Sequence, residues 1–135
     1  MKWHPGVLTV CLSVLLQAGP AFDPVKDVVL SVSGGSLMVK VPKGVHLKTH
    51  SFGVVLGSPG TLRLGTLPPP VGQDEAGDPI WRGTVQVELQ GKGLAEPVQL
   101  WITYQPCTEG PEGMCFLPVK RHLVVPLGAV ASERP

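Results

Sequence analysis

The sequence contains few charged residues and no excess of either sign. Lysine and arginine together number 11 and aspartate and glutamate 10, the formal net charge is +1 at pH 7, and charged residues make up 16% of the chain. Nucleic-acid-binding domains usually carry a clustered basic excess, so this balance argues against a nucleic-acid partner. Nucleophile-elbow, phosphate-loop, zinc-protease and paired-carboxylate motifs are also missing. We therefore infer no hydrolytic chemistry and no small-molecule substrate.

Aromatic residues and helical patterns are scarce, whereas turn residues are abundant. Aromatic residues make up 5% of the chain, against 17 glycines and 15 prolines. Apolar residues alternate with a period of two, as Leu37, Val39 and Val41 do, and this period is typical of strands. Seven or eight such segments in a chain long enough for one domain predict an all-β fold, an immunoglobulin-like antiparallel β-sandwich. The predicted strands cover residues 27–32, 36–41, 45–48, 52–56, 61–67, 80–90, 97–105 and 119–127.

A long hydrophobic run is missing beyond the amino terminus. Residues 1–21 have the order of a signal peptide, with Lys2 as the positive start, an apolar stretch at 6–16 and a small-residue cleavage site at the end. The apolar stretch is shorter than the roughly 20 residues that span a bilayer, although the sequence leaves open whether it is cleaved or kept as an anchor. We expect a periplasmic or otherwise extracytoplasmic domain at residues 22–127 and a flexible tail at 128–135.

Two of the three cysteines fall within the predicted domain, because Cys11 belongs to the predicted signal peptide. Cys107 and Cys115 have seven residues between them, and in an oxidising compartment they are expected to form a disulfide. Such a bond would stabilise the fold only weakly, since the loop-entropy estimate of its stabilisation for a nine-residue loop is roughly 2.5 kcal/mol. A short exposed loop is also accessible to a partner thiolate. The spacing alone leaves a redox role and a structural role equally open.

Several segments, in the same order, resemble the amino-terminal periplasmic domain of the DsbD family. Thr-Tyr-Gln-Pro-Cys at residues 103–107, a turn-rich loop, Cys-Phe-Leu-Pro at 115–118 and Val-Val-Pro-Leu at 124–127 are similar to that domain's cysteine segment. Pro-Lys-Gly-Val-His-Leu at 42–47 and Ile-Trp-Arg-Gly at 80–83 resemble two of its strand segments. The resemblance covers nearly the whole predicted domain.

The resemblance implies an immunoglobulin-like sandwich whose cysteine pair passes reducing equivalents between thioredoxin-fold partners. By this likeness Cys115 would form the mixed disulfide with a partner, and Cys107 would resolve it. The polar loop at residues 73–79 lies where the family has a cap loop over the cysteines. The candidate cap or shielding residues are Asp74, Glu75, Tyr104 and Phe116. For the tyrosine, a place in the core is an equally good interpretation, and the acidic pair could simply be a solvated loop.

Three features depart from the family pattern. The cysteine spacing is longer, and residues 71–79 contain no aromatic side chain that could shield the disulfide. The transmembrane and thioredoxin portions of full-length DsbD are missing. We therefore expect a free-standing monomer that works with separate thioredoxin-fold redox proteins, with a membrane thiol transporter as a further candidate partner.

The sequence leaves two other functions open. An exported binding or assembly module with an inert disulfide fits the same strands. A copper or zinc site could combine His46 and His50 with Met114 or His122. No usual metal-ligand spacing is present, so we interpret the first two as exposed histidines of an edge strand and expect no metal or cofactor. Trp101 is interpreted as covering the second face of its sheet rather than docking a partner.

Overall fold

The computed structural model describes residues 21–132, and almost every regular element in this range is a β-strand. The predicted signal peptide, apart from Ala21, lies outside the described residues. The prediction of an all-β chain is confirmed, and no helix within the described range is long and apolar enough to cross a membrane. The strands are β1 (Val29–Ser33), β2 (Ser36–Lys40), β3 (Val45–Lys48), β4 (Gly53–Leu56), β5 (Thr61–Leu64), β6 (Gly72–Gln73), β7 (Pro79–Trp81), β8 (Thr84–Lys92), β9 (Val98–Tyr104), β10 (Pro106–Thr108), β11 (Val119–Val125) and β12 (Ala131–Ser132). Two short 3-10 helices are η2 (Thr49–Ser51) and η3 (Leu127–Ala129).

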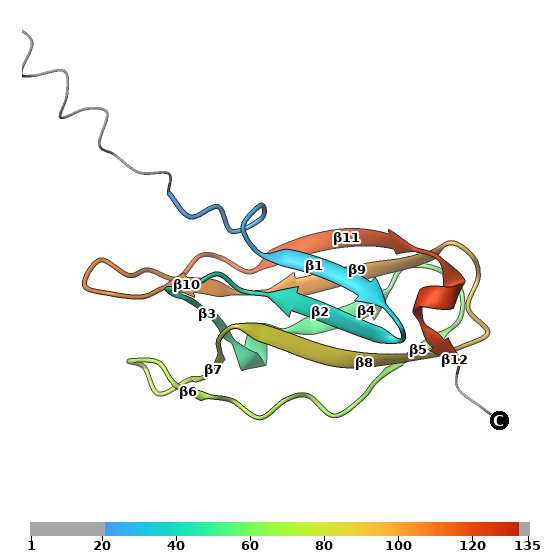
Figure 1. The fold of residues 1–135 in the computed structure, drawn as a ribbon, viewed down its shortest axis with the longest axis horizontal. Helices are drawn as coiled ribbons and strands as arrows, with labels where there is room; N and C mark the ends of the chain where they lie inside the picture. Colours follow the sequence, from blue (N-terminus) through green and yellow to red (C-terminus); the bar gives the residue numbers. More distant parts are fainter. Residues whose placement is uncertain (1–20, 133–135) are drawn as a thin grey trace, which may run out of the picture.

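The strands form a sandwich of two main sheets with a third sheet of short strands at one end. One main sheet runs β1-β2-β8, with β5 and β12 also paired to β8, and the other runs β11-β9-β4. The end sheet has the order β10-β3-β7-β6. In Figure 1 the β1-β2-β8 sheet lies in front of the β11-β9-β4 sheet, and the end sheet lies at the other end of the molecule from β12. The predicted immunoglobulin-like sandwich is confirmed.

Alternation along the long strands places one face of each in the core. In β8, Val85, Val87 and Leu89 are buried while the residues between them are exposed. Fully burying one such side chain contributes about 1.5–3 kcal/mol. A slip of one residue would expose the whole set, so this pattern fixes the register. The corresponding buried set of β9 is Val98, Leu100, Ile102 and Tyr104.

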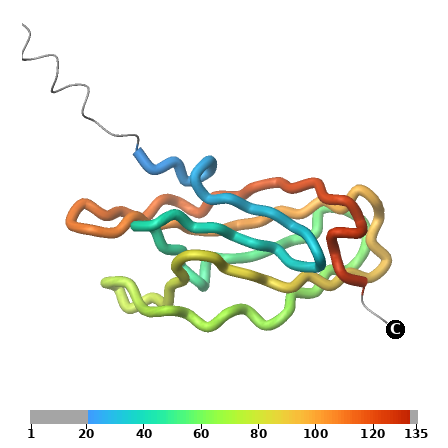
Figure 2. The backbone as a smooth tube through the Cα atoms, in the orientation of Figure 1, coloured from blue at the N-terminus to red at the C-terminus, as the bar shows by residue number. Residues whose placement is uncertain are grey.

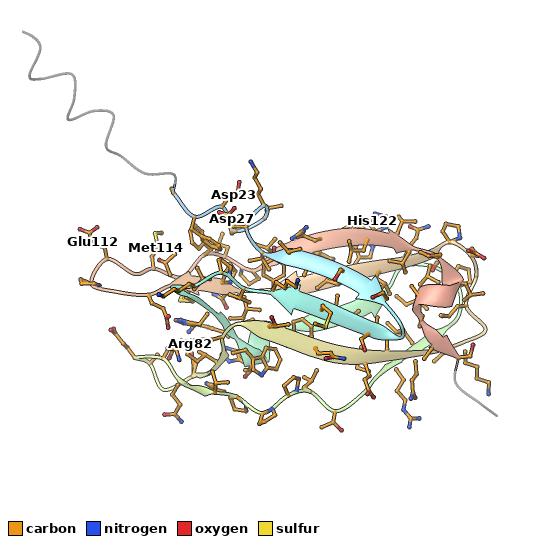
Figure 3. All side chains as sticks on the ribbon, in the orientation of Figure 1. Asp23, Asp27, Arg82, Glu112, Met114 and His122 are labelled. Atoms are coloured by element: carbon orange, nitrogen blue, oxygen red, sulfur yellow. A yellow bond between two sulfur atoms is a disulfide. The ribbon has the colours of Figure 1, made fainter. Side chains whose placement is uncertain are left out.

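The prediction of one strand over residues 80–90 is wrong, because two strands in different sheets occupy this stretch. β7 pairs with β3 and β6, whereas β8 pairs with β2, and Arg82 and Gly83 lie between them. Gly83 has a φ of 72°, which residues with a Cβ rarely adopt, and its carbonyl accepts the Val41 backbone N–H at 2.9 Å. The break leaves Arg82 exposed beside the end sheet (Figure 3).

The carboxyl-terminal segment is packed as far as Ser132. After β11 the chain forms η3 and then β12, which pairs in parallel with β8. Ala129 and Val130 are buried, and the carbonyl of Ala129 accepts the Gly35 backbone N–H at 2.9 Å. Residues 128–132 of the predicted flexible tail therefore belong to the folded domain, because Ala129 and Val130 cover the core at this end and β12 pairs with β8.

Candidate functional site

Two segments project from the same end of the sandwich, opposite β12. We call residues 107–115 the cysteine loop and residues 74–78, between β6 and β7, the cap loop. Figure 2 shows both loops at this end, near the start of the described chain. The end sheet positions them, since β10 leads into the first and β6 and β7 flank the second.

Cys107 and Cys115 form a disulfide, as predicted. The S–S distance is 2.05 Å and the Cα atoms are 3.9 Å apart. The two residues face each other as an isolated antiparallel bridge. Cys107 is only 1% exposed, whereas Cys115 is an exposed residue. The disulfide is therefore exposed on the Cys115 side and covered on the Cys107 side.

The cysteine loop is closed by hydrogen bonds as well as by the disulfide. The Thr108 backbone N–H donates to the Met114 carbonyl at 2.8 Å, and the Phe116 N–H donates to the Pro106 carbonyl at 3.0 Å. The Thr108 hydroxyl oxygen accepts the Met114 N–H at 3.0 Å. The Gln105 side-chain amide adds a bond to the Phe116 carbonyl at 3.0 Å. None of these contacts involves sulfur, so we expect the loop to stay closed when the disulfide opens.

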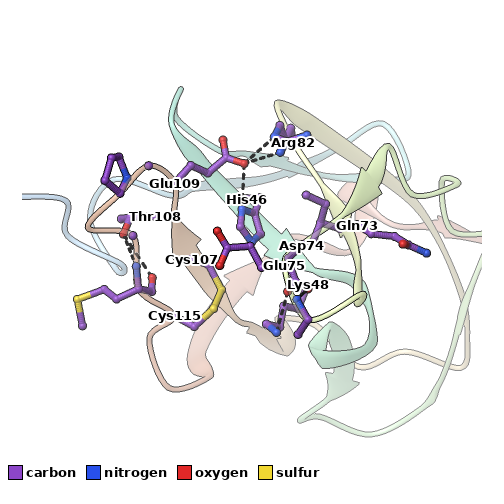
Figure 4. A pocket seen from close by; sticks show the side chains of 16 residues that line it. His46, Lys48, Gln73, Asp74, Glu75, Arg82, Cys107, Thr108, Glu109 and Cys115 are labelled. Atoms are coloured by element: carbon purple, nitrogen blue, oxygen red, sulfur yellow. Dashed lines mark hydrogen bonds and ion pairs between the residues drawn. A yellow bond between two sulfur atoms is a disulfide. The ribbon is translucent and has the colours of Figure 1, made fainter.

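A pocket of about 510 Å³ lies between β3, the cap loop and the cysteine loop, and both cysteines line it (Figure 4). His46 and Lys48 enter it from β3, since residues two apart on a strand share a face. Asp74 and Glu75 enter from the cap loop, and Glu109 enters from the cysteine loop. The disulfide thus lies in a strongly polar setting that mixes both signs of charge.

Lys48 ties the cap loop to β3. Its Nζ lies 2.9 Å from Asp74 Oδ2 and 2.8 Å from Asp78 Oδ2. Asp74 Oδ1 also accepts the backbone N–H groups of Ala76 and Asp78 at 3.0 and 2.9 Å. The hydrogen bond from Lys48, then that from the Asp78 N–H, lowers the pKa of Asp74, and the two carboxylates raise the pKa of Lys48. Asp74 is therefore not part of a freely solvated loop.

Glu109 links Arg82 to His46. Glu109 Oε2 accepts hydrogen bonds from Arg82 Nη2 and, at 2.8 Å, from Arg82 Nε, and it lies 3.1 Å from His46 Nδ1. The hydrogen bond from Arg82 has the largest effect on the pKa of Glu109 and lowers it, burial opposes this, and His46 adds to the lowering. An ionised carboxylate only accepts hydrogen bonds, so the hydrogen of this contact is on His46 Nδ1.

His46 is buried, so the interpretation of His46 and His50 as two exposed histidines of an edge strand is wrong for His46. β3 lies between β10 and β7, and His46 is 7% exposed. His50 is exposed in η2. His46 Nε2 is buried without a hydrogen-bond partner. Within residues 21–132 no three His, Cys, Asp or Glu side chains form a group that could hold a metal ion.

Of the four candidate shielding residues, the two acidic ones line the pocket and the two aromatic ones lie elsewhere. Tyr104 is fully buried in the sandwich core, where its hydroxyl donates to the Pro24 carbonyl at 2.7 Å. This burial raises the pKa of Tyr104. Phe116 is half-buried and packs edge-on against Phe22, with ring centroids 5.6 Å apart. Phe116 thus packs the segment that follows Cys115 against the amino-terminal segment.

Trp101 and His122 lie on the outer face of the β11-β9-β4 sheet. Their rings stack with centroids 4.6 Å apart, and Lys120 Nζ lies 5.3 Å from the Trp101 ring centroid. Trp101 is 37% exposed. The side chains therefore cover this face, and His122 is held there rather than beside His46.

Solved structures share this architecture. The DsbD amino-terminal domain of Neisseria meningitidis in the reduced form aligns with a TM-score of 0.53 and 21% identity, over 78% of this chain and 89% of the other. The fold is that of the DsbD amino-terminal domain. A structure of the complex between the DsbD and PilB amino-terminal domains from Neisseria meningitidis aligns with a TM-score of 0.53 and 18% identity, over 79% of this chain and 88% of the other. No protein-family profile and no curated protein sequence matches the chain.

The sequence did not reveal that Lys48 and Arg82 line the pocket or that His46 is buried in it. The positions of these three side chains depend on contacts with segments that are distant in the sequence. A signal was present, since the two DsbD-like segments outside the cysteine region, 42–47 and 80–83, contain His46 and Arg82. These two segments thus meet the two cysteines in one pocket.

Proposed function

We propose that this protein is an extracytoplasmic thiol–disulfide exchange module that relays electrons through the Cys107–Cys115 pair. The observation that carries the proposal is the asymmetry of the disulfide, with Cys115 exposed and Cys107 buried on the wall of a polar pocket. Exchange requires a thiolate to approach one sulfur along the S–S axis, and the exposed side offers that approach.

Exchange begins when a partner thiolate attacks the Cys115 sulfur. A bond forms between the partner and Cys115 while the Cys107–Cys115 bond breaks, and Cys107 leaves with the electron pair and takes up a proton. The second thiolate of the partner then attacks the partner's own sulfur in the mixed disulfide and releases Cys115. The partner dithiol is oxidised and the cysteine pair is reduced. In the reverse direction Cys115 attacks an acceptor disulfide and Cys107 resolves the mixed disulfide.

A purely structural disulfide is less well supported. The loop it closes already has backbone and side-chain hydrogen bonds at both ends, including those of Thr108 to Met114. The bond spans a sequence separation of 8, for which the loop-entropy contribution is only about 2.5 kcal/mol. A bond between distant strands of the sandwich would restrain more of the chain.

The proposed partners are thioredoxin-fold redox proteins, with a membrane thiol transporter as a further candidate partner. Two comparisons support a protein partner: the Neisseria meningitidis DsbD amino-terminal domain has a structure in the reduced form, and one in complex with the PilB amino-terminal domain. A domain of this fold thus exists in a reduced state and binds another protein domain. The proposed extracytoplasmic location rests on the predicted signal peptide at residues 1–21.

A trapping experiment tests the asymmetry. Cys107→Ser and Cys115→Ser variants, both with Cys11→Ala, are mixed with a thioredoxin-fold protein whose single remaining active-site cysteine carries an aromatic thiol leaving group. We expect a covalent complex with Cys107→Ser, in which Cys115 is free, and none with Cys115→Ser. Equal trapping of both variants would refute the assigned roles.

A second measurement tests exchange itself. The wild-type disulfide is incubated with an active, reduced thioredoxin-fold protein, and alkylation of both cysteines is followed over minutes. We expect both to become alkylated. A disulfide that stays closed under these conditions would refute the relay and favour the inert binding module.

A further inference from the structure

We propose that His46, held by Glu109, donates a proton to Cys107 when the disulfide opens and accepts it back when the disulfide closes. This inference rests on the proposed exchange function and names the residue that handles the proton. His46 acts on the reacting sulfur, whereas Glu109 is a positioning residue that fixes the imidazole ring.

His46 and Cys107 lie side by side on neighbouring strands. β3 and β10 are antiparallel, and their register places Cys107 opposite His46. Directly opposed residues of such a pair project from the same face, with Cβ atoms about 4.5–5.5 Å apart. Both residues line the pocket and are almost fully buried. In Figure 4 the imidazole ring lies between the Glu109 carboxylate and the disulfide.

The ring is oriented so that its second nitrogen is available. His46 Nδ1 lies 3.1 Å from Glu109 Oε2, which Arg82 also holds through its Nε at 2.8 Å. His46 Nε2 is buried and has no hydrogen-bond partner. Buried polar atoms without partners are rare, and functional sites are one place where they persist. The arrangement is one that activates thiols in other proteins: a sulfur nucleophile lies beside an imidazole, and a third group orients the imidazole.

The opening step places negative charge on a buried sulfur. Cys107 is 1% exposed, and loss of hydration disfavours its thiolate form. Delivery of a proton to Cys107 as the S–S bond breaks removes this charge where it develops. A buried leaving sulfur therefore needs a nearby proton donor more than an exposed one does.

The other charged groups around His46 are less suited to this task. Those that face it across the pocket are Lys48 on β3, Arg82 after β7, Asp74 and Glu75 in the cap loop, and Glu109 in the cysteine loop. Lys48 is engaged by two aspartates and Arg82 by Glu109. Carboxylates disfavour a nearby thiolate by like charge. Among the charged side chains along the described pocket wall, His46 thus has a ring nitrogen, Nε2, that can carry a proton and has no other hydrogen-bond partner.

The proposed step balances without a further reactant. The partner thiolate supplies the electron pair of the new bond to Cys115, and Cys107 leaves with the pair of the broken bond. Protonated His46 transfers its Nε2 proton to the Cys107 sulfur and becomes neutral, and it regains a proton from solvent. In the closing step neutral His46 takes the proton of the Cys107 thiol, and the resulting thiolate attacks the Cys115 sulfur of the mixed disulfide. The Cys107–Cys115 bond forms again, and the bond from Cys115 to the acceptor breaks, so that the acceptor thiolate leaves with the electron pair.

The first test follows the Cys107 thiol directly, in the full chain carrying Cys115→Ala. The carbon NMR signal of the Cys107 Cβ atom is recorded against pH. We expect His46→Gln to raise the midpoint of thiolate formation by roughly one to three pH units. His46→Asn should shift it in the same direction, and His122→Gln, an exposed histidine on β11, should leave it unchanged. An unchanged midpoint in folded His46→Gln overturns the proposal. If that variant does not fold, an unchanged midpoint in folded His46→Asn does so.

The second test separates this inference from the exchange function. With both cysteines present, reduction by a reduced thioredoxin-fold protein should slow roughly a hundredfold in His46→Gln, as for loss of a general acid. Equal rates in wild type and His46→Gln would overturn the role of His46 and leave the exchange function intact. A wild-type disulfide that no such protein reduces, together with a shifted Cys107 midpoint, would refute the exchange function and preserve the coupling between His46 and Cys107.

Discussion

Lys48 Nζ lies 2.9 Å from Asp74 Oδ2, and this contact joins the cap loop to the strand that carries His46. Asp78 accepts a second hydrogen bond from the same ammonium group at 2.8 Å. Because Asp74 also holds the turn of its own loop, Lys48 ties the tip of the β6–β7 hairpin to β3 beside the disulfide. The cap-loop side of the pocket is thus joined to β3 by two ion pairs.

Lys48→Met should raise the titration midpoint of Asp74 toward its ordinary value of 3.8, because the hydrogen bond from Lys48 is the main cause of the lowered pKa. The measurement is the pH dependence of the Asp74 carboxyl carbon signal by NMR. Lys92→Met, on a strand of another sheet, is the control and should leave this midpoint in place. An Asp74 midpoint that does not move in Lys48→Met would contradict the tether.

The same ion pair has a defined pH window. Since the pKa of Asp74 is lowered from 3.8 in the folded state, its contribution to stability is complete above 3.8 and is lost as the pH falls through the lowered value. The pKa of Lys48 is raised from 10.5, so its contribution is complete below 10.5 and is lost as the pH rises through the raised value. The cap loop should therefore stay tethered throughout the neutral range.

Glu109→Gln should destabilise the domain by roughly 1 kcal/mol at neutral pH, because it removes the charged link between Arg82 and His46. The lowered pKa of Glu109 means that the wild-type advantage is complete above 4.5 and shrinks as the pH falls below it. Urea unfolding of both proteins at several pH values measures this difference. Glu112→Gln, in the same loop, should change stability by less than about 0.5 kcal/mol. A wild-type advantage that persists unchanged in acid would contradict the assignment.

The parts of the fold that follow from local pattern were predictable. Val85, Val87 and Leu89 alternate with polar residues, so their strand and its buried face can be inferred from the sequence. The break at Gly83 was missed, although a glycine inside a strand pattern is a signal for a bulge or bend. Whether the chain then changes sheets depends on the partner strands, which the local sequence does not specify.

The candidate site was only half predictable for the same reason. The cysteine pair could be identified from its spacing and the export signal, because both are local features. The burial of His46 follows from the pairing of β3 with β10, whose residues lie some sixty positions later, in a sheet that no local pattern distinguishes. Lys48 meets Asp78 across a sequence separation of 30. Such long-range contacts turn exposed-looking polar residues into parts of a pocket.

Replacement of both cysteines by alanine should leave the sandwich folded and lower its stability by at most about 2.5 kcal/mol. The reason is that the loop keeps the hydrogen bonds of Thr108 and Phe116, which do not involve sulfur. Urea unfolding and the amide exchange of these two residues provide the measurement. Thr108→Val in the disulfide-bonded protein removes the hydroxyl contact and should cost roughly 1 kcal/mol. An unfolded double-alanine variant would show that the disulfide is a structural requirement.

Gly113→Ala should distort the cysteine loop, because a Cβ at this position would collide with the backbone carbonyl oxygen of Thr108 and lie 3.1 Å from that of Gly110. Backbone atoms cannot move aside as a flexible side chain can, so we expect a loss of roughly 1–3 kcal/mol in unfolding free energy and faster exchange of the Thr108 amide. Gly128→Ala is the matched control, since a Cβ there meets nothing within 4 Å. If the two alanine variants unfold alike and protect the Thr108 amide equally, the tight turn that brings Cys115 back to Cys107 is not formed as described.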